Sequence, residues 1–392
     1  EDKKIPERVI SSIEFRDKIL EKVTEILPGN KGFNLKIATK EVCEAVAKKI
    51  ADEFHGDWEN DVKFSEFQLD CTIKILESRY EKKNPIKAQV LTAGVGSGKT
   101  IGFTIATLIE ARKSILDGVS DDDWKTTSIF IYPRTQLAID QHEEISKIAS
   151  YMTDSNGNNV SPEVWLEHYQ NRFYTEGAVT SGVAEKYSME SKPIPIIITT
   201  YETLKRRMVR PEFIKKISKH LSTIVLDEIH LSSGVSGGMS SYLLSRLSAT
   251  AEKEVYWIGA SATIARPDEH ASKLFGLKKE EVGIIEPKDS ELKQAGINHH
   301  IFMKPNPGMS ILGSLVNTTS RLIHNRRHNI SKRVDEDGNI IKLTDEDSTN
   351  RPKSIGFADN LDMLGRWNDD LRENERTSQY TKSNKKHPTK EK

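Results

Sequence analysis

A glycine-rich stretch at residues 92–100, TAGVGSGKT, limits the folds open to this chain more than any other segment. It follows a short apolar run, AQVLT at 88–92, and precedes a helical pattern at about 101–112. Glycines let the backbone turn tightly, so several amide N–H groups can face one anion. The N-terminus of the following helix adds positive potential at the same point. The stretch therefore predicts a phosphate-binding loop between a buried strand and a helix.

The side chains of this loop match the needs of a nucleoside triphosphate. Lys99 is expected to reach the β and γ phosphates, and the Thr100 hydroxyl is expected to coordinate Mg²⁺. Ala93 stands where the pattern has its first glycine, but that position ends the strand. A glycine-rich turn without a ligand is the weaker interpretation, since four residue types recur at the required spacing. The predicted nucleotide-binding residues of the loop are Gly94, Gly96, Ser97, Gly98, Lys99 and Thr100.

Two adjacent carboxylates follow a second buried strand. The run TIVL at 223–226 is followed at once by Asp227 and Glu228. In parallel α/β sheets ligands bind at the carboxyl ends of the strands, so both side chains are expected on the same edge as Lys99. Asp227 is predicted to hold Mg²⁺ through water, and Glu228 to polarise the water that attacks the γ phosphate. An acidic helix start is the alternative for Asp-Glu alone, but the phosphate-binding loop favours the catalytic interpretation.

Further apolar, β-branched runs alternate with helical segments along the chain. Such runs are typical of strands buried on both faces of a parallel sheet, so the fold class is predicted to be α/β with a parallel sheet flanked by helices. The predicted organisation is a helical N-terminal region at 1–65, an ATP-binding domain at 66–265 with an insertion near 152–192, a linker at 266–309, the beginning of a second domain at 310–375, and a polar tail at 376–392. The other expected strands of the first domain are 128–132, 194–199 and 255–259.

The short motifs, in order, resemble those of superfamily-two helicases of the DEAD/DEAH type. The resemblance covers about residues 64–265, and its motifs are Gln68 upstream of the phosphate loop, Tyr132–Gln141, Ile198–Leu204, Asp227–His230 and Ser261–Thr263. It implies a RecA-like P-loop NTPase that hydrolyses ATP with Mg²⁺. It also implies that Gln68 reads adenine, that His230 completes the DEAD/DEAH motif of the catalytic site, and that Ser261 and Thr263 couple hydrolysis to strand binding. The residues that it implies for nucleic-acid contact are Arg134, Thr135, Thr200 and Thr203.

A second RecA-like domain is expected to begin near residue 310, because Lys353–Asp359 resembles motif IV of the same superfamily. No motif V and no arginine-finger motif VI follow before Lys392. An arginine finger contributes on the order of 10³–10⁵ in rate in related systems. The leading hypothesis is a helicase or translocase. The alternative is a nucleotide switch or energy subunit of a larger complex that holds the remaining motifs.

The segment after the carboxylates bears on the type of nucleic acid. Asp227–Arg246, with its glycine-rich portion at 232–238, resembles bacterial DNA helicases more than RNA-type DEAD-box enzymes. Those DNA helicases include the large helicases of anti-phage defence systems such as DISARM. The resemblance therefore implies DNA more than RNA as the partner, and a role in antiviral defence.

The composition limits partners and compartment. The formal net charge is +0, which excludes a uniformly basic coat and leaves room for a local basic groove. Basic stretches at 205–219 and 321–333 are either such contacts or solvated helix faces. Cys43 and Cys71 are the only cysteines and lie in apolar, helix-like contexts, as in a reducing compartment. No apolar run approaches the roughly 20 residues of a membrane helix. These features predict a cytoplasmic protein with no membrane partner, whereas nucleic acid and further protein partners are implied by the helicase resemblance and by the missing motifs.

Overall fold

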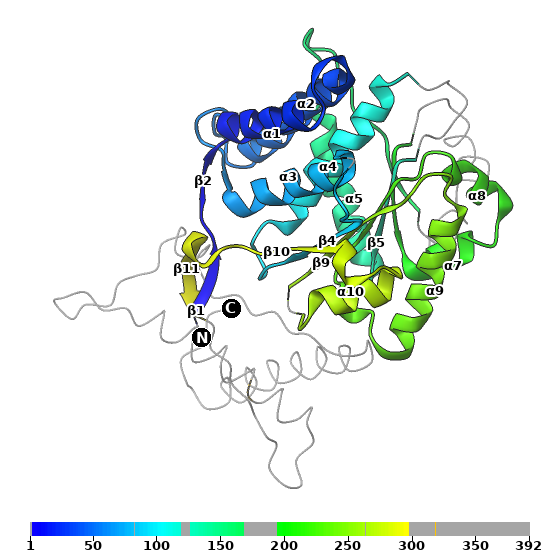
Figure 1. Ribbon diagram of the computed structural model, residues 1–392. Helices are drawn as coiled ribbons and strands as arrows, with labels where there is room; N and C mark the ends of the chain where they lie inside the picture. The colour runs from blue at the N-terminus through cyan, green and yellow to red at the C-terminus, as the bar shows by residue number, and fades with distance from the viewer. Residues whose placement is uncertain are drawn as a thin grey trace, which may run out of the picture. The chain divides into compact units, whose positions relative to one another are not determined.

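The computed structural model describes residues 2–81, 83–118, 126–167, 194–262, 264–297 and residue 318. Contacts divide the chain into two compact units, Glu1–Asn298 and His299–Lys392. A seven-stranded parallel sheet in the order β10-β4-β9-β8-β5-β7-β6 lies at the centre of the first unit (Figure 1). The predicted parallel α/β fold is thereby confirmed. The strands are β4 (Ala88–Thr92), β5 (Ser128–Tyr132), β6 (Val164–Leu166), β7 (Ile196–Thr200), β8 (Thr223–Leu226), β9 (Tyr256–Ser261) and β10 (Val282–Ile285).

The central strands are buried on both faces, which explains their almost uninterrupted apolar sequences. Every residue of β5, β7, β8 and β9 is buried. Successive side chains alternate between the faces: Phe130 and Tyr132 join one core cluster, and Ile129 and Ile131 join the other. The two clusters are the two layers between the sheet and its helices.

The first cluster packs the sheet against five helices, which lie together on one side in Figure 1. The helix α4 begins at Lys99, directly after the phosphate-binding loop, and contacts both α2 and α3. The packing of α4 in this layer therefore fixes the position of the phosphate-binding loop that precedes it. Its helices are α1 (Ser12–Ile26), α2 (Phe33–Glu53), α3 (Glu66–Tyr80), α4 (Lys99–Leu116) and α5 (Thr135–Ser150).

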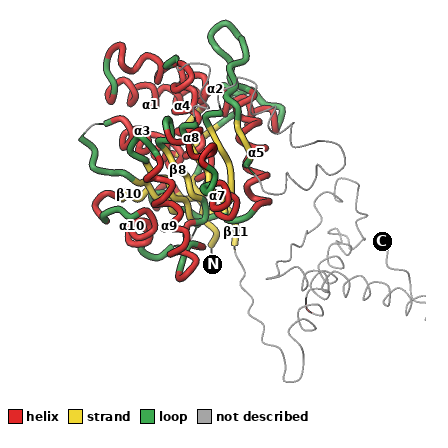
Figure 2. Tube along the Cα trace, turned by 90° about the vertical axis from the view of Figure 1, so that its right-hand side faces the viewer, coloured by secondary structure: helices red, strands yellow, loops and turns green. Residues whose placement is uncertain are grey.

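The second cluster packs the opposite face against four helices. Figure 2 shows this layer from a direction at right angles to that of Figure 1. Two of the helices begin directly after strands or turns that carry predicted site residues, so this layer positions the second half of the site. Its helices are α7 (Tyr201–Arg207), α8 (Pro211–Ser218), α9 (Gly234–Thr250) and α10 (Pro267–Phe275).

The N-terminal region contains strands as well as the expected helices. The strand β2 (Arg8–Ser11) pairs antiparallel with β3 (Lys63–Ser65), and β1 (Asp2–Pro6) pairs antiparallel with β11 (Leu292–Ile297). A buried ion pair, Arg112 Nε to Glu41 Oε2 at 2.5 Å, ties α2 to α4. Because α1 and α2 share the first core cluster with the sheet, this region is an integral layer of the first unit.

The segment expected to be a linker, 266–309, contributes to the sheet where it is described. Its α10 and β10 pack onto the fold, and β10 pairs with β4 at the edge of the sheet. Only Val282 and Ile285 of this four-residue strand are buried, so its apolar signal is too weak to stand out in the sequence. Of the expected insertion, residues 164–166 form the edge strand β6. Residues 168–193, the expected second domain apart from residue 318, and the polar tail lie outside the described residues.

Short 3₁₀ turns complete the connections: η1 (Gly29–Gly32), η3 (Ile229–Leu231), η4 (Lys279–Glu281) and η5 (Asp289–Glu291). Within the described ranges, every helix is too short or too polar to cross a lipid bilayer.

Candidate nucleotide and nucleic-acid site

The glycine-rich loop joins β4 to α4, in the strand–loop–helix context that its sequence predicts. Gly96 and Gly98 have φ of +87° and +83°, a left-handed conformation that glycine adopts without steric cost. Gly98 is also confined, since a Cβ there would lie 2.2 Å from the Gln68 side-chain amide. The loop therefore needs glycine at these two positions for its conformation and, at Gly98, also for space.

Lys99 lies over the loop that precedes it. Its ammonium group donates a hydrogen bond to the carbonyl oxygen of Ala93 and another, at 3.3 Å, to that of Gly94. Burial lowers the pKa of Lys99, while the negative charges of Asp227 and Glu228 act in the opposite direction. The lysine is thus within electrostatic reach of both carboxylates, which is the convergence that the sequence predicts.

The topology of the sheet explains this convergence. The strand β9 separates β4 from β8, and all three run parallel, so their carboxyl ends share one edge. Asp227 follows β8 directly and accepts a hydrogen bond from Glu228 N at 2.9 Å. Burial, followed by the charge of Glu228, raises the pKa of Asp227 to about 6. Ionisation of Asp227 therefore costs free energy in this site, and a bound cation would lower that cost.

Glu228 and His230 lie on a strained turn next to the end of β9. Glu228 has φ of +52°, which is uncommon for a residue other than glycine. His230 Nδ1 lies 3.0 Å from Ser261 Oγ and 3.1 Å from Glu228 Oε2. The contact with Ser261 is a hydrogen bond, whereas Glu228 Oε2 makes only the charge contact with His230 and has no hydrogen-bond partner among the described residues. The structure brings together His230 and Ser261, two of the predicted catalytic residues, whereas Thr263 lies outside the described residues.

The loop fits a triphosphate with magnesium. Ser97 Oγ is buried and has no hydrogen-bond partner in the described part of the chain. A Cβ at Gly94 or Gly96 would meet nothing within 4 Å, so space is open above the backbone. No group of three or more His, Cys, Asp or Glu side chains that could hold a metal ion occurs among the described residues. Thr100 and Asp227 are the residues that would hold Mg²⁺, which proteins usually bind through one or two side chains together with water and phosphate oxygens.

Gln68 occupies a different environment from a free adenine-binding side chain. It is 1% exposed and forms a capping box at the start of α3, where its Oε1 accepts from Ser65 N at 3.0 Å. Its amide nitrogen faces Gly98 of the loop. The structure thus places Gln68 against the phosphate-binding loop, and its contact with adenine stays a prediction.

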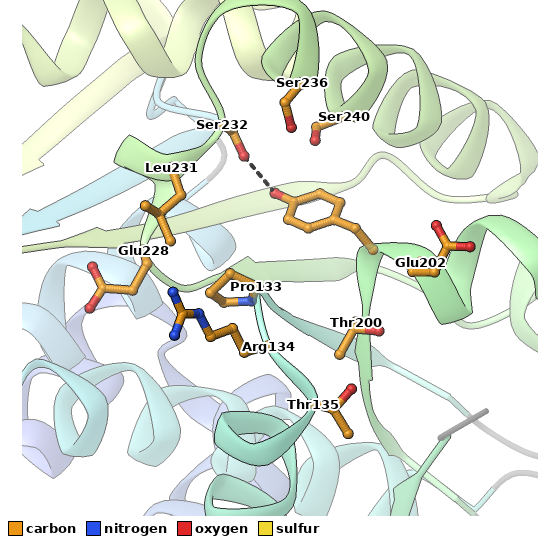
Figure 3. Close-up of a pocket in the computed structure, with 11 residues that line it drawn as sticks. Pro133, Arg134, Thr135, Thr200, Glu202, Glu228, Leu231, Ser232, Ser236 and Ser240 are labelled. Atoms are coloured by element: carbon orange, nitrogen blue, oxygen red, sulfur yellow. Dashed lines mark hydrogen bonds between the residues drawn. The ribbon is translucent and has the colours of Figure 1, made fainter. Parts of the chain in front are cut away.

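A cleft of about 410 Å³ opens at the same edge of the sheet. Figure 3 shows Ser232, Ser236 and Ser240 on one side of it and Arg134 and Thr135 toward the other. Three predicted nucleic-acid contacts line this cleft together with the catalytic candidate Glu228. The lining residues are Pro133, Arg134, Thr135, Thr200, Tyr201, Glu202, Glu228, Leu231, Ser232, Ser236 and Ser240.

Thr203, the fourth predicted contact, does not line the cleft. It is 5% exposed, and its backbone N–H donates to Thr200 Oγ1 at 3.3 Å. Thr200 Oγ1 in turn donates to Thr203 Oγ1 at 3.1 Å. Thr200 is thus the N-cap of α7, and the Thr203 hydroxyl accepts from the Thr200 hydroxyl inside the helix start, whereas a nucleic-acid contact was predicted for it.

The sequence interpretation missed the wall formed by the start of α9. Ser232 Oγ donates to Tyr201 Oη at 3.3 Å, which joins the turn after the carboxylates to the start of α7 (dashed in Figure 3). A Cβ at Gly237 would lie 2.6 Å from Ser232 O, so glycine permits this close packing. The alternation of serine and glycine at 232–240 is the signal that could have identified the wall.

Asp227→Asn tests the electrostatic strain in the site. The pKa of Asp227 rises from 3.8 to about 6 on folding, so the ionised form is disfavoured in the folded chain. The free energy of unfolding of the chain should therefore fall as the pH rises from about 4 to about 6, and this loss of stability should persist at higher pH. We expect Asp227→Asn to raise the free energy of unfolding of the nucleotide-free chain by on the order of 1–3 kcal/mol at pH 7.5, and by much less at pH 4.

Urea unfolding followed by circular dichroism at both pH values measures this change. Asp140→Asn, on the exposed surface of α5, is the matched control and should shift stability by less than about 0.5 kcal/mol. A loss of stability in Asp227→Asn at pH 7.5, or an equal gain at both pH values, would contradict the expectation.

Residues 67–270 match the protein family described as DEAD/DEAH box helicase. Two curated relatives are ATP-dependent helicases. The ATP-dependent helicase hrq1 of Schizosaccharomyces pombe is 26% identical over 196 residues, which cover 48% of this chain and 16% of the relative. The ATP-dependent helicase Lhr-Core of Methanocaldococcus jannaschii is 27% identical over 215 residues, covering 52% and 24%. The chain thus matches a quarter or less of the length of each relative.

Solved helicase structures share the fold. Mss116p bound to ssRNA and AMP-PNP superimposes with a TM-score of 0.54 at 16% identity, covering 84% of this chain and 56% of that one. The DUF1998 helicase MrfA gives a TM-score of 0.54 at 17% identity, covering 90% and 42%. At these identities the likeness shows a RecA-like helicase fold.

Proposed function

Because the chain belongs to the DEAD/DEAH box helicase family, we propose that it is the ATP-hydrolysing part of a motor that unwinds or translocates along nucleic acid. The observation that supports this most directly is the position of Glu228. It adjoins Asp227 and acts electrostatically on Lys99, and it also lines the cleft with Arg134. One side chain therefore belongs both to the triphosphate site and to the candidate strand-binding surface.

Each residue of the triphosphate site has a distinct task in this proposal. The loop amides and Lys99 bind the phosphates, and Lys99 exchanges its carbonyl partners for phosphate oxygens when ATP enters. Thr100 and Asp227 would hold Mg²⁺, which when bound would supply positive charge to offset that of the phosphates. Glu228 orients the attacking water and accepts its proton. His230 fixes the distance between this turn and the end of β9 through Ser261.

The cleft is suited to a sugar–phosphate backbone. Thr135 is the first residue of α5, a helix without a side-chain cap, so its free backbone amides face the cleft edge. Arg134 is exposed beside them. Thr200 lines the cleft at the end of β7, and its hydroxyl would turn from Thr203 Oγ1 to a phosphate oxygen when a strand binds. Amides, hydroxyls and an arginine bind phosphates without reading bases. We propose sequence-independent binding that weakens strongly with salt.

Hydrolysis and strand binding are coupled in this proposal through the short turn between Glu228 and Ser232. A strand in the cleft would contact Ser232 and Tyr201, which are joined by a hydrogen bond. The left-handed Glu228 lies four residues away on the same turn. A shift of this turn on strand binding would reposition the Glu228 carboxylate, whose Oε2 has no hydrogen-bond partner in the described region.

DNA is the proposed substrate in preference to RNA. The support is the resemblance of Asp227–Arg246 to bacterial DNA helicases, and the serine- and glycine-rich wall of the cleft lies within that segment. A place in anti-phage defence and association with further subunits rest on the same resemblance and are part of the proposal.

Nucleic-acid-stimulated ATP hydrolysis tests the function. We expect single-stranded DNA to raise turnover at low salt, with less stimulation by RNA, and the stimulation to decline as salt increases. Phosphate release measured with single-stranded DNA, duplex DNA and RNA over a salt series gives the comparison. ATP binding without turnover, restored by a partner chain, would favour the alternative of a nucleotide switch or energy subunit.

Arg134→Ala separates strand binding from hydrolysis in the same assay. It should raise the DNA concentration for half-maximal stimulation several-fold, because one phosphate contact is lost, and leave turnover without DNA unchanged. Arg210→Ala, on the short connection between α7 and α8, is a control of equal charge that does not line the cleft. Equal effects of the two variants would argue against the cleft as the strand-binding site.

A further inference from the structure

Tyr132, the last residue of β5, carries a buried hydroxyl that the tasks above do not use. The residue is 1% exposed, and its Oη has no hydrogen-bond partner within the described ranges. A buried hydroxyl without a partner destabilises a fold, whereas phenylalanine would fill the same space without that cost. Because Tyr132 ends β5 at the carboxyl ends of the strands, where the nucleotide site lies, a partner that arrives with the ligands could satisfy this hydroxyl.

The register of the sheet places Tyr132 beside Asp227. In the parallel pair of β5 and β8, Ile131 lies opposite Leu226, and Asp227 N donates to Ile131 O at 3.2 Å. The next residues are Tyr132, which ends β5, and Asp227, which directly follows the end of β8. Laterally paired residues project from the same face of a sheet, and Tyr132 belongs to the core cluster under α4. Both side chains thus lie on the face that carries the phosphate-binding loop.

The electrostatics agree with this position. Burial, followed by the negative charge of Asp227, raises the pKa of Tyr132 well above its ordinary value. The phenol therefore keeps its proton and remains a hydrogen-bond donor at neutral pH. Asp227 already accepts one hydrogen bond at Oδ1 from Glu228 N. Carboxylates that hold a metal are usually oriented by further donors around them.

We propose that Tyr132 is a positioning residue for the magnesium–nucleotide complex. Its hydroxyl would donate to a water that enters with Mg²⁺ and nucleotide, and that water would orient the Asp227 carboxylate, since Tyr132 and Asp227 share no direct hydrogen bond in the nucleotide-free chain. The proposal rests on the proposed nucleotide site and adds a residue to it. It also assigns a second role to the end of β5, where Pro133 and Arg134 begin the cleft.

Tyr132→Phe removes only the hydroxyl, and the affinity for a fluorescent ADP derivative over a Mg²⁺ series is the readout. We expect the Mg²⁺ concentration for half-maximal binding enhancement to rise about 10-fold and kcat to fall by a similar factor. Nucleotide affinity in EDTA should stay unchanged. The melting temperature of the nucleotide-free chain should stay equal or rise, because an unpaired buried hydroxyl is gone.

Tyr256→Phe is the matched control. Tyr256 is a buried tyrosine of the same sheet. It lies at the amino ends of the strands, away from the nucleotide site, where it pairs with Thr223 at the start of β8. This variant should keep the parental Mg²⁺ dependence. A Tyr132→Phe variant with parental Mg²⁺ dependence, or with equal losses of affinity in EDTA and in Mg²⁺, would overturn the proposal. Failure of the parent chain to bind nucleotide at all would refute the proposed function itself.

Discussion

Lys99→Ala is expected to lower DNA-stimulated ATP turnover by about two to three orders of magnitude. Lys99 is the cation of the loop, and its ammonium group lies over the carbonyls of Ala93 and Gly94, within electrostatic reach of Asp227 and Glu228. Removing one preorganised charge from a water-poor site costs roughly 10²–10³ in kcat. ATP affinity should fall as well, because the same charge binds the phosphates in the ground state.

Lys113→Ala is the control for this substitution. It lies on the same helix as Lys99 but near the other end, where it pairs with Asp117. Phosphate release and nucleotide binding, measured in parallel with circular dichroism, separate chemistry from folding. Turnover of Lys99→Ala within a few-fold of the parent would remove the glycine-rich loop from the proposed mechanism.

Glu228→Gln is expected to reduce hydrolysis by about 10²–10⁴-fold while leaving ATP binding near parental strength. Glutamine keeps the size of the side chain and loses the ability to accept a proton, which is worth that range for a general base. It also keeps the same left-handed backbone, so the strain at φ +52° is equal in both proteins. Glycine would relieve that strain and confuse the comparison.

Glu202→Gln is the matched control, because Glu202 also lines the cleft and pairs with Arg206 on the surface of α7. Single-turnover hydrolysis and equilibrium ATP binding, each with and without DNA, give the readout. Hydrolysis and binding that fall together in Glu228→Gln would indicate a role in holding nucleotide and would contradict its assignment as the base.

Much of the nucleotide site follows from local sequence. The sequence of the loop at 92–100 predicts a strand before it and a helix after it, and the structure has β4 and α4 at these places. The loop's left-handed glycines and its lysine bind phosphate in that context. The apolar runs at 128–132 and 223–226 are strands at those same residues in the structure, since unbroken β-branched sequences suit a sheet covered on both sides. The carboxyl ends of parallel strands then meet at one edge.

Structural features with weak local sequence signals could not be predicted from the sequence. The edge strand β10 has two buried residues, and β6 has one, so neither alternation nor length distinguishes it from a loop. The pairing of Thr203 with the N-cap residue Thr200 also depends on context, because the Thr203 hydroxyl could face solvent or the helix start. The serine wall of the cleft forms from a segment without apolar periodicity, on which sequence patterns depend.

Local sequence by itself determined the chemistry of the phosphate-binding loop and the carboxylates, since backbone conformation and side-chain type act within a few residues. Only the tertiary structure decided which distant groups share space. Strand order and register placed Tyr132 beside Asp227, and helix packing placed Ser232 against Tyr201. Such neighbours are set by the burial of whole layers, which no short stretch of sequence encodes.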